Sequence, residues 1–153
     1  MRHYYWDSGI FIAYLNDERE TRGELIDHIS QFLDEAGGGH CRIYTSTITI
    51  AEILPQTLKN RELSSFNEFV RDFEGAVFTV QPDPNVMGLA ASLRGQRYTA
   101  HANAPRPRSM ETPDAIHLAT AILLESHYGV KLDAFHTFDN GKSKTPEVLS
   151  QSR

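Results

Sequence analysis

Strand-like and helix-like blocks of apolar residues alternate along this chain, and the first pair lies at positions 3–15. Consecutive aromatic residues at 4–6 favour a buried strand, and the apolar residues at 10–15 fall at helical spacing. Asp7 and Ser8 separate these two segments, so the sequence predicts a strand, a short polar connection and then a helix. Because open α/β sheets bind ligands outside the carboxyl ends of their strands, Asp7 is placed at a candidate binding edge. The alternative is that Asp7 and Ser8 only cap the helix, since both are preferred N-cap residues.

The same patterning continues through the rest of the chain. Amphipathic spacing predicts helices at 21–36, 47–59, 63–75, 85–100 and 112–128. Short apolar runs predict further strands at 42–46, 76–80 and 132–138. Pro55 is expected to kink or break the helix in which it lies, and two prolines predict a loop at 104–109.

Strands that alternate with helices indicate a parallel sheet with helices on both faces. We therefore expect one domain over 1–153, a three-layer α/β/α sandwich around a mainly parallel sheet of four to five strands. The helix at 112–128 is expected to be central and buried, because its alanines allow close packing on a sheet. The polar residues after about 143 are expected to form a tail that frays.

Composition is that of an ordinary folded domain, with 40% hydrophobic and 23% charged residues. Cys41 is the only cysteine, so no internal disulfide and no cysteine-based zinc cage is expected. A charge comes too early for a signal peptide and no apolar run is long enough to span a membrane, so we expect a cytoplasmic protein. The net charge of −5 argues against a general electrostatic grip on nucleic acid but leaves room for a local basic surface.

Four acidic residues are predicted at one edge of the sheet. Asp7 and Asp139 end strands, whereas Glu52 and Asp114 lie near the starts of helices. Clustered carboxylates repel one another unless a cation is present, and their hard oxygens favour Mg²⁺ or Mn²⁺. Such ions activate water against phosphate esters, which suggests phosphodiester hydrolysis. Taken singly, Glu52 could be a surface helix residue and Asp114 only a partner of the helix dipole.

Four segments, in this order, form a pattern that is typical of a known family: YYWDSGIFI at 4–12, TIAEI at 49–53, TPDAIHLATA at 112–121 and HTFD at 136–139. The third is the most specific, and together they are spread over nearly the whole chain. On these residues the chain resembles PIN-domain ribonucleases, and most of all the toxins of VapBC-type toxin–antitoxin pairs. The fold implied by the resemblance is the PIN-like form of the three-layer sandwich.

The resemblance implies a metal-dependent endoribonuclease. Asp7, Glu52 and Asp114 match the three principal metal-binding acids of the family. Asp139 matches a fourth acid whose identity varies, and Ser8 matches a hydroxyl residue that supports the site. These four acids would be the catalytic residues, hold Mg²⁺ or Mn²⁺, and hydrolyse RNA with a metal-activated water. The resemblance also implies a homodimer and a partner antitoxin that covers the acidic cleft.

Recognition of RNA would need basic residues outside the acidic cluster, because RNA of this kind is recognised by loop shape and splayed bases. Candidates for phosphate contacts are Arg94, Arg97, Arg106, Arg108, Lys142 and Lys144. The alternative for each of these side chains is that it contacts only water, which is the usual state of a surface cation.

Three further questions stay open. His117 lies three residues after Asp114 on one helix face, and is expected to support the site or pack rather than bind metal. The chain could be a catalytically inactive PIN-like module for RNA binding or assembly, although all four acids are present. A phosphatase with Asp7 as nucleophile is the other alternative, but it normally has a second acid where Gly9 stands.

Overall fold

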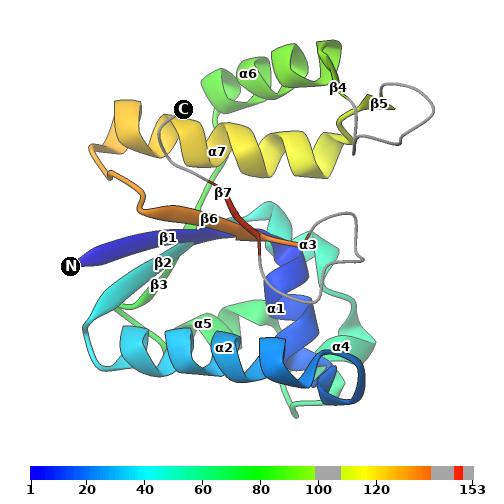
Figure 1. The fold of residues 1–153 in the computed structure, drawn as a ribbon, viewed down its shortest axis with the longest axis vertical. Helices are drawn as coiled ribbons and strands as arrows, with labels where there is room; N and C mark the ends of the chain where they lie inside the picture. The colour runs from blue at the N-terminus through cyan, green and yellow to red at the C-terminus, as the bar shows by residue number, and fades with distance from the viewer. Residues whose placement is uncertain (99–107, 139–146, 150–153) are drawn as a thin grey trace.

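The larger sheet has the strand order β3-β2-β1-β6-β7 (Figure 1). The computed structural model of the protein describes residues 1–98, 108–138 and 147–149. The strands of this sheet are β1 (Arg2–Trp6), β2 (Cys41–Ser46), β3 (Val77–Val80), β6 (Ala134–Thr137) and β7 (Glu147–Leu149). The first four run parallel and β7 pairs antiparallel with β6 at the edge. The prediction of a mainly parallel sheet of four to five strands is confirmed for the described ranges.

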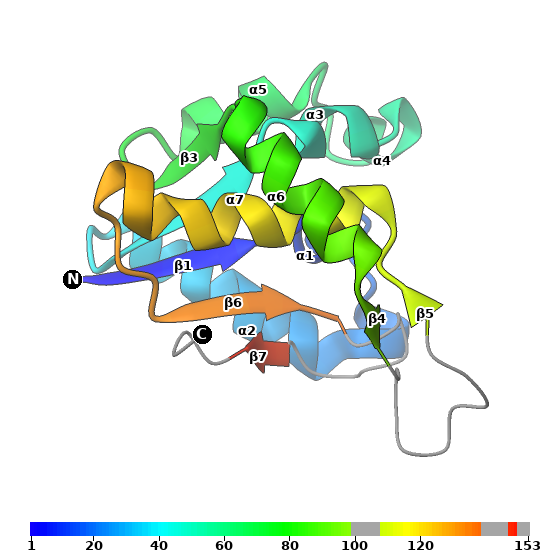
Figure 2. The same cartoon turned by 90° about the horizontal axis from the view of Figure 1, so that it is seen from above.

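Helices cover both faces of this sheet. They are α1 (Ser8–Leu15), α2 (Arg19–Gly37), α3 (Ile48–Glu52), α4 (Pro55–Lys59), α5 (Phe66–Asp72), α6 (Pro84–Gly95) and α7 (Thr112–Tyr128). In Figure 1, α1, α2 and α5 lie below the sheet, α7 lies above it and α6 is outermost; Figure 2 shows α6 crossing over α7. This arrangement confirms the three-layer α/β/α architecture. No helix within the described ranges is long and apolar enough to cross a membrane.

Strand β1 is central, because it pairs with β2 on one side and β6 on the other. Tyr4 and Trp6 pack into the larger core, which includes residues of α1, α2 and α5. Tyr5 points to the opposite face and packs with residues of α7. This alternation follows from the two-residue repeat of a strand, and it assigns Asp7 to the same side as Tyr5.

Helix α7 packs closely because many of its inward positions are small. Ala115 and Ala119 are buried against α6, while Ala121 is buried against the sheet. Gly129 ends the helix with φ 67°, a left-handed conformation that a residue without Cβ adopts at little cost. Helix α7 begins near the carboxyl edge of the parallel strands and runs antiparallel to them (Figure 1). Asp114 lies in the first turn of this helix.

Two predicted boundaries are wrong. The helix expected over 85–100 ends at Gly95, because Gln96 is extended (ψ 150°) and leads into the short strand β4 (Arg97–Tyr98). Strand β4 pairs antiparallel with β5 (Arg108–Ser109), which lies inside the loop expected at 104–109. The tail expected after about 143 contains β7, whose pairing satisfies backbone groups at the edge of β6.

His136 is buried in an aromatic cluster on the larger core side of the sheet. Trp6 Nε1 donates a hydrogen bond to His136 Nδ1 at 2.8 Å, and the Tyr4 ring stacks on the imidazole with centroids 5.1 Å apart. The ring of Phe32 lies 4.8 Å from the imidazole, centroid to centroid. Burial lowers the pKa of His136 to about 4, because the imidazolium would lose its hydration.

Acid should therefore destabilise the fold through His136. The folded pKa of about 4 lies below the ordinary value of 6.5, so stabilisation is complete above pH 6.5 and is lost as the pH falls towards 4. We expect this group to lower the free energy of unfolding by up to roughly 3 kcal/mol over that range. His136→Gln keeps an acceptor for Trp6 but does not titrate, so its stability should vary less with pH. Urea unfolding at several pH values measures both proteins, and equal pH dependence would contradict the assignment.

Candidate active site

Asp7 lies at the carboxyl end of the central strand, directly before α1. Asp7 is the N-cap residue of α1, with an extended backbone (φ −80°, ψ 177°), and its side chain makes no capping hydrogen bond. Oδ2 of Asp7 accepts a hydrogen bond from the Thr137 hydroxyl at the end of β6. Oδ1 is buried and has no hydrogen-bond partner among the residues that the structure describes. A buried carboxylate oxygen without a donor is costly, so this atom requires an explanation.

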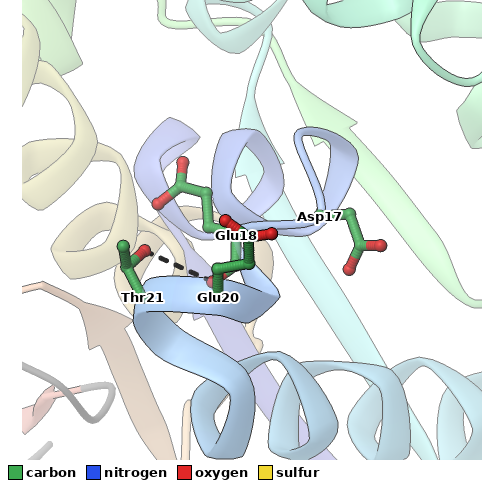
Figure 3. Close-up of a pocket in the computed structure, with 4 residues that line it drawn as sticks. All are labelled: Asp17, Glu18, Glu20 and Thr21. Carbon is green, nitrogen blue, oxygen red and sulfur yellow. Dashed lines mark hydrogen bonds between the residues drawn. The ribbon is translucent and has the colours of Figure 1, made fainter.

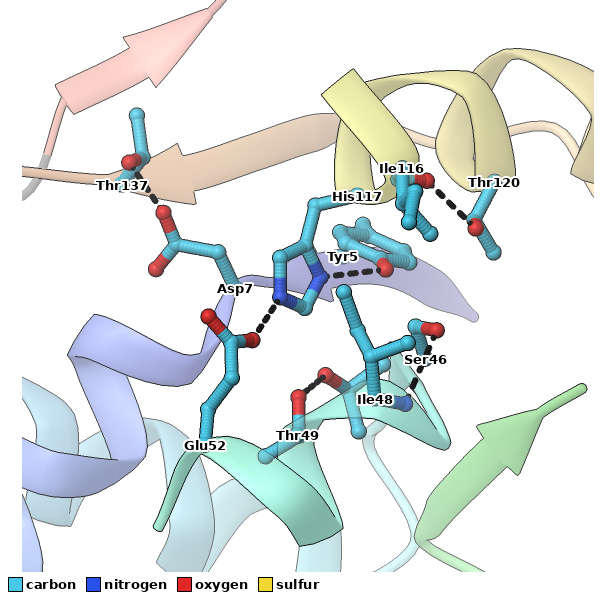
Figure 4. A network of polar contacts seen from close by, with 11 residues as sticks. Tyr5, Asp7, Ser46, Ile48, Thr49, Glu52, Ile116, His117, Thr120 and Thr137 are labelled. Carbon is cyan, nitrogen blue, oxygen red and sulfur yellow. Dashed lines mark hydrogen bonds and ion pairs between the residues drawn. The ribbon is translucent and has the colours of Figure 1, made fainter. Parts of the chain in front are cut away.

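Glu52 is the last residue of α3 and points into the same region as Asp7 (Figure 4). His117 from α7 links Glu52 to Tyr5 on the central strand by two hydrogen bonds. His117 Nε2 lies 2.8 Å from Glu52 Oε1, and His117 Nδ1 lies 2.8 Å from the hydroxyl oxygen of Tyr5. The side chain of His117 is 1% exposed and that of Glu52 is 26% exposed, so a buried ring contacts a carboxylate that still reaches solvent.

The turn between β2 and α3 holds Glu52 in place. The hydroxyls of Thr45 and Thr49 are hydrogen-bonded at 2.8 Å, and both residues are fully buried. The Ile48 amide donates to Ser46 Oγ at 3.2 Å, which satisfies a donor at the start of the helix. The break expected at Pro55 is confirmed, since a new helix begins there. A helix as short as α3 has little stability of its own, so these contacts are what fix it.

Asp114 contributes negative charge from the first turn of α7, three residues before His117, and its side chain is exposed. Burial raises the pKa of Asp7, and the negative charge of Asp114 adds to that shift. Although Asp114 keeps contact with solvent, partial loss of hydration raises its pKa, and the charges of Glu111 and Glu52 add to that shift. The acids therefore disfavour one another's charged form across the same edge of the sheet.

Tyr5 is kept protonated by its surroundings. Burial raises the pKa of its phenol well above the ordinary value, and the negative charges of Asp7 and Glu52 add to the shift. The hydroxyl is therefore available as a hydrogen-bond donor near neutral pH.

Position 9 leaves little room for a side chain next to Asp7. A Cβ added to Gly9 would lie 3.3 Å from Asp7 Oδ1 and 3.4 Å from the ring of Phe138, so its neighbours would have to move. The guanidinium of Arg22 lies over that ring, 4.4 Å from its centroid. Arg22 departs from helical geometry inside α2 (φ −143°, ψ 38°) and forms an ion pair with Glu18 at 3.3 Å. A cation is thus held against the ring that borders Asp7.

Asp7 and Glu52 both act electrostatically on Tyr5, and Glu52 is bonded to His117, which also acts on Asp7; Asp114 lies three residues before His117 on α7. Ser8 is buried as the first residue of α1. Arg94 is exposed on α6, and only the backbone is described for Arg97 and Arg108. The remaining predicted site residues lie outside the described residues: Asp139, Arg106, Lys142 and Lys144.

The chemistry of these acids suits a hard divalent cation. Within the described ranges, no group of three or more His, Cys, Asp or Glu side chains lies close enough to hold one ion. Mg²⁺, however, is commonly bound by one or two carboxylates, with waters and substrate phosphates completing its coordination. Oδ1 of Asp7 lacks a donor, and Glu52 has a second oxygen besides the one that contacts His117. Two carboxylates therefore suffice for the donor set that such an ion needs.

A second acidic surface lies at the turn between α1 and α2 (Figure 3). Asp17, Glu18, Glu20 and Thr21 line a hollow of about 500 Å³, and the Thr21 hydroxyl donates to the backbone carbonyl of Glu18 at 3.4 Å. Asp17 and Glu20 are exposed, so water stabilises their charge and no bound cation is required. The hollow includes none of the acids predicted from the sequence.

The fold is a three-layer α/β/α sandwich, and Asp7, Glu52 and Asp114 lie near the carboxyl edge of its parallel strands. Comparison of the chain with protein-family models, with curated proteins and with solved structures finds no match.

Sequence reasoning missed two hydrogen-bonding residues of the site: Thr137, which donates to Asp7, and Tyr5, which is bonded to His117. A signal existed for Tyr5, because a residue two positions before Asp7 on a strand shares its side of the sheet. Thr137 gave no such signal, since its contact with Asp7 depends on how β6 aligns with β1. His117, expected to support the site or to pack, contacts both Tyr5 and Glu52.

Asp7→Asn should stabilise the protein at neutral pH in the absence of divalent metal. The amide keeps an oxygen for the Thr137 hydroxyl and removes a buried negative charge, so we expect a gain of about 1 kcal/mol. The gain should shrink as the pH falls, because the raised pKa of Asp7 lets the wild-type carboxyl take up a proton. Thermal unfolding at several pH values measures this. Asp34→Asn on the exposed surface of α2 is the control, and a destabilised D7N would contradict the prediction.

Proposed function

We propose that the protein is a metal-dependent endoribonuclease that hydrolyses RNA phosphodiester bonds. One observation carries the proposal: Asp7 Oδ1 is buried without a donor among the described residues, in the electrostatic field of Asp114. Acids that disfavour one another's charge are stabilised by a divalent cation. The resemblance of four segments of the sequence to PIN-domain ribonucleases supports the same chemistry.

Each acid has a distinct part in this proposal. Asp7 and Glu52 would hold Mg²⁺ or Mn²⁺, and Asp114 would add negative charge at the same edge. The ion, when bound, supplies an activated water and positive charge next to the phosphate. Thr137 occupies Oδ2 of Asp7, which leaves Oδ1 as the available oxygen of a carboxylate fixed on the central strand. Asp139 is assigned a supporting role by the resemblance alone.

The acidic residues of the site repel the negatively charged phosphates of an RNA substrate. Cations outside the cluster would therefore contact the RNA phosphates. Arg22 is held against Phe138 next to the Asp7 region, and Arg94 is exposed on α6. These two arginines are the candidates that the described side chains support.

We also propose that the nuclease is the toxin of a toxin–antitoxin pair and forms a homodimer. The resemblance is the main support. A second support is the apolar surface beside Glu52, since Ile50 is 37% exposed and Leu54 is 66% exposed. Exposed apolar side chains next to a site are suited to contact with a protein that covers it.

Purified protein should cleave a panel of structured and single-stranded RNAs with Mg²⁺ or Mn²⁺, and EDTA should abolish cleavage. Asp7→Asn and Glu52→Gln should lower the rate at least about 100-fold, because charge stabilisation by the metal contributes several kcal/mol. Electrophoresis of end-labelled RNA gives the rate and the position of cleavage. Asp34→Asn makes the same change of charge on an exposed helix and should cleave like the wild type.

A folded wild-type protein that cleaves no RNA in the panel, and whose Tm neither metal raises, would contradict the proposal. The catalytically inactive RNA-binding or assembly module would then be favoured. Fluorescence anisotropy with the same RNAs distinguishes those two remaining functions, because only the first predicts binding.

A further inference from the structure

Tyr5, His117 and Glu52 form a hydrogen-bonded chain across three elements, β1, α7 and α3 (Figure 4). The two donor–acceptor distances are both 2.8 Å. Tyr5 is 0% exposed and His117 is 1% exposed, so only the Glu52 end of the chain reaches solvent. Buried polar groups of this kind define one arrangement when every donor and acceptor is satisfied.

The direction of the hydrogen bonds follows from the groups involved. A carboxylate only accepts, so His117 Nε2 must carry the proton that it shares with Glu52 Oε1. A neutral imidazole then has an acceptor at Nδ1, and the Tyr5 hydroxyl is the donor that meets it. One tautomer of His117 therefore satisfies all three residues at once.

Glu52 needs such an anchor more than Asp7 does. It ends a helix of five residues, its backbone turns extended at Ile53 (ψ 116°), and its side chain has several rotatable bonds. The bond to a buried imidazole fixes one carboxylate oxygen, Oε1, whereas Oε2 makes no hydrogen bond within the described ranges.

We propose that Tyr5 and His117 are positioning residues, which hold the Glu52 carboxylate in one orientation through a single imidazole tautomer so that Oε2 is presented to the divalent ion. The inference rests on the proposed function, because it assumes that Glu52 is a ligand. His117 is not itself a ligand, since both ring nitrogens are engaged. Removal of a hydrogen-bond partner of a metal ligand typically weakens metal affinity or activity by about 10- to 100-fold.

Three variants of the full chain separate positioning from packing. His117→Leu removes the bond to Glu52 and one of the polar partners of the buried Tyr5 hydroxyl, which also interacts with Thr120 and Ser46. Tyr5→Phe combined with His117→Leu removes both polar groups, so its Tm should lie closer to that of the wild type than the Tm of H117L does. His117→Gln retains an N–H donor that reaches Glu52.

Mn²⁺ affinity, measured from the signal of free Mn²⁺ in electron paramagnetic resonance, is the main readout. H117L and the double variant should bind Mn²⁺ about 10- to 100-fold more weakly than the wild type, and H117Q should recover most of the loss. Nitrogen-15 NMR of the wild-type imidazole should show the proton of His117 on Nε2.

A double variant that is folded and binds Mn²⁺ like the wild type would overturn the inference and leave the proposed function standing. A proton on Nδ1 of His117 would overturn it as well. Wild-type protein that binds no Mn²⁺ would overturn both the inference and the proposed function, so the two failures are distinguishable.

Discussion

The buried negative charge of Asp7 is the constraint on which the arrangement of this edge depends. The carboxylate lies at the end of the central strand, where one oxygen accepts from Thr137 and the other has no donor among the described residues. Burial of such a group costs free energy, and its charge is made less favourable still by Asp114. A fold that keeps this arrangement has given up stability at one place, which is what binding sites commonly require.

The parallel sheet explains how the other groups reach Asp7. Because β2, β1 and β6 run in the same direction, their carboxyl ends bring α3, α1 and Thr137 to one edge. Helix α7 packs closely enough, through its alanines, for His117 to contact both the central strand and Glu52. The site therefore depends on the layers of the whole domain and not on a single loop.

Strong local patterns allowed much of this to be predicted from the sequence. The aromatic strand before Asp7, the helix over 112–128 and the break at Pro55 all follow from short-range preferences. The bond between Tyr5 and His117 joins residues 112 positions apart and depends on how closely a helix packs on the sheet, which periodicity does not reveal. Strands β4, β5 and β7 were missed because two or three residues carry no measurable period, and their pairing is set by neighbouring strands.

Crystals of the full chain grown with Mn²⁺, with diffraction recorded at the manganese absorption edge, test the central claim most directly. The account predicts an anomalous peak between Asp7 Oδ1 and the Glu52 carboxylate, with Glu52 still bonded to His117. A peak only in the acidic hollow of Asp17, Glu18 and Glu20, with none next to Asp7, would contradict it.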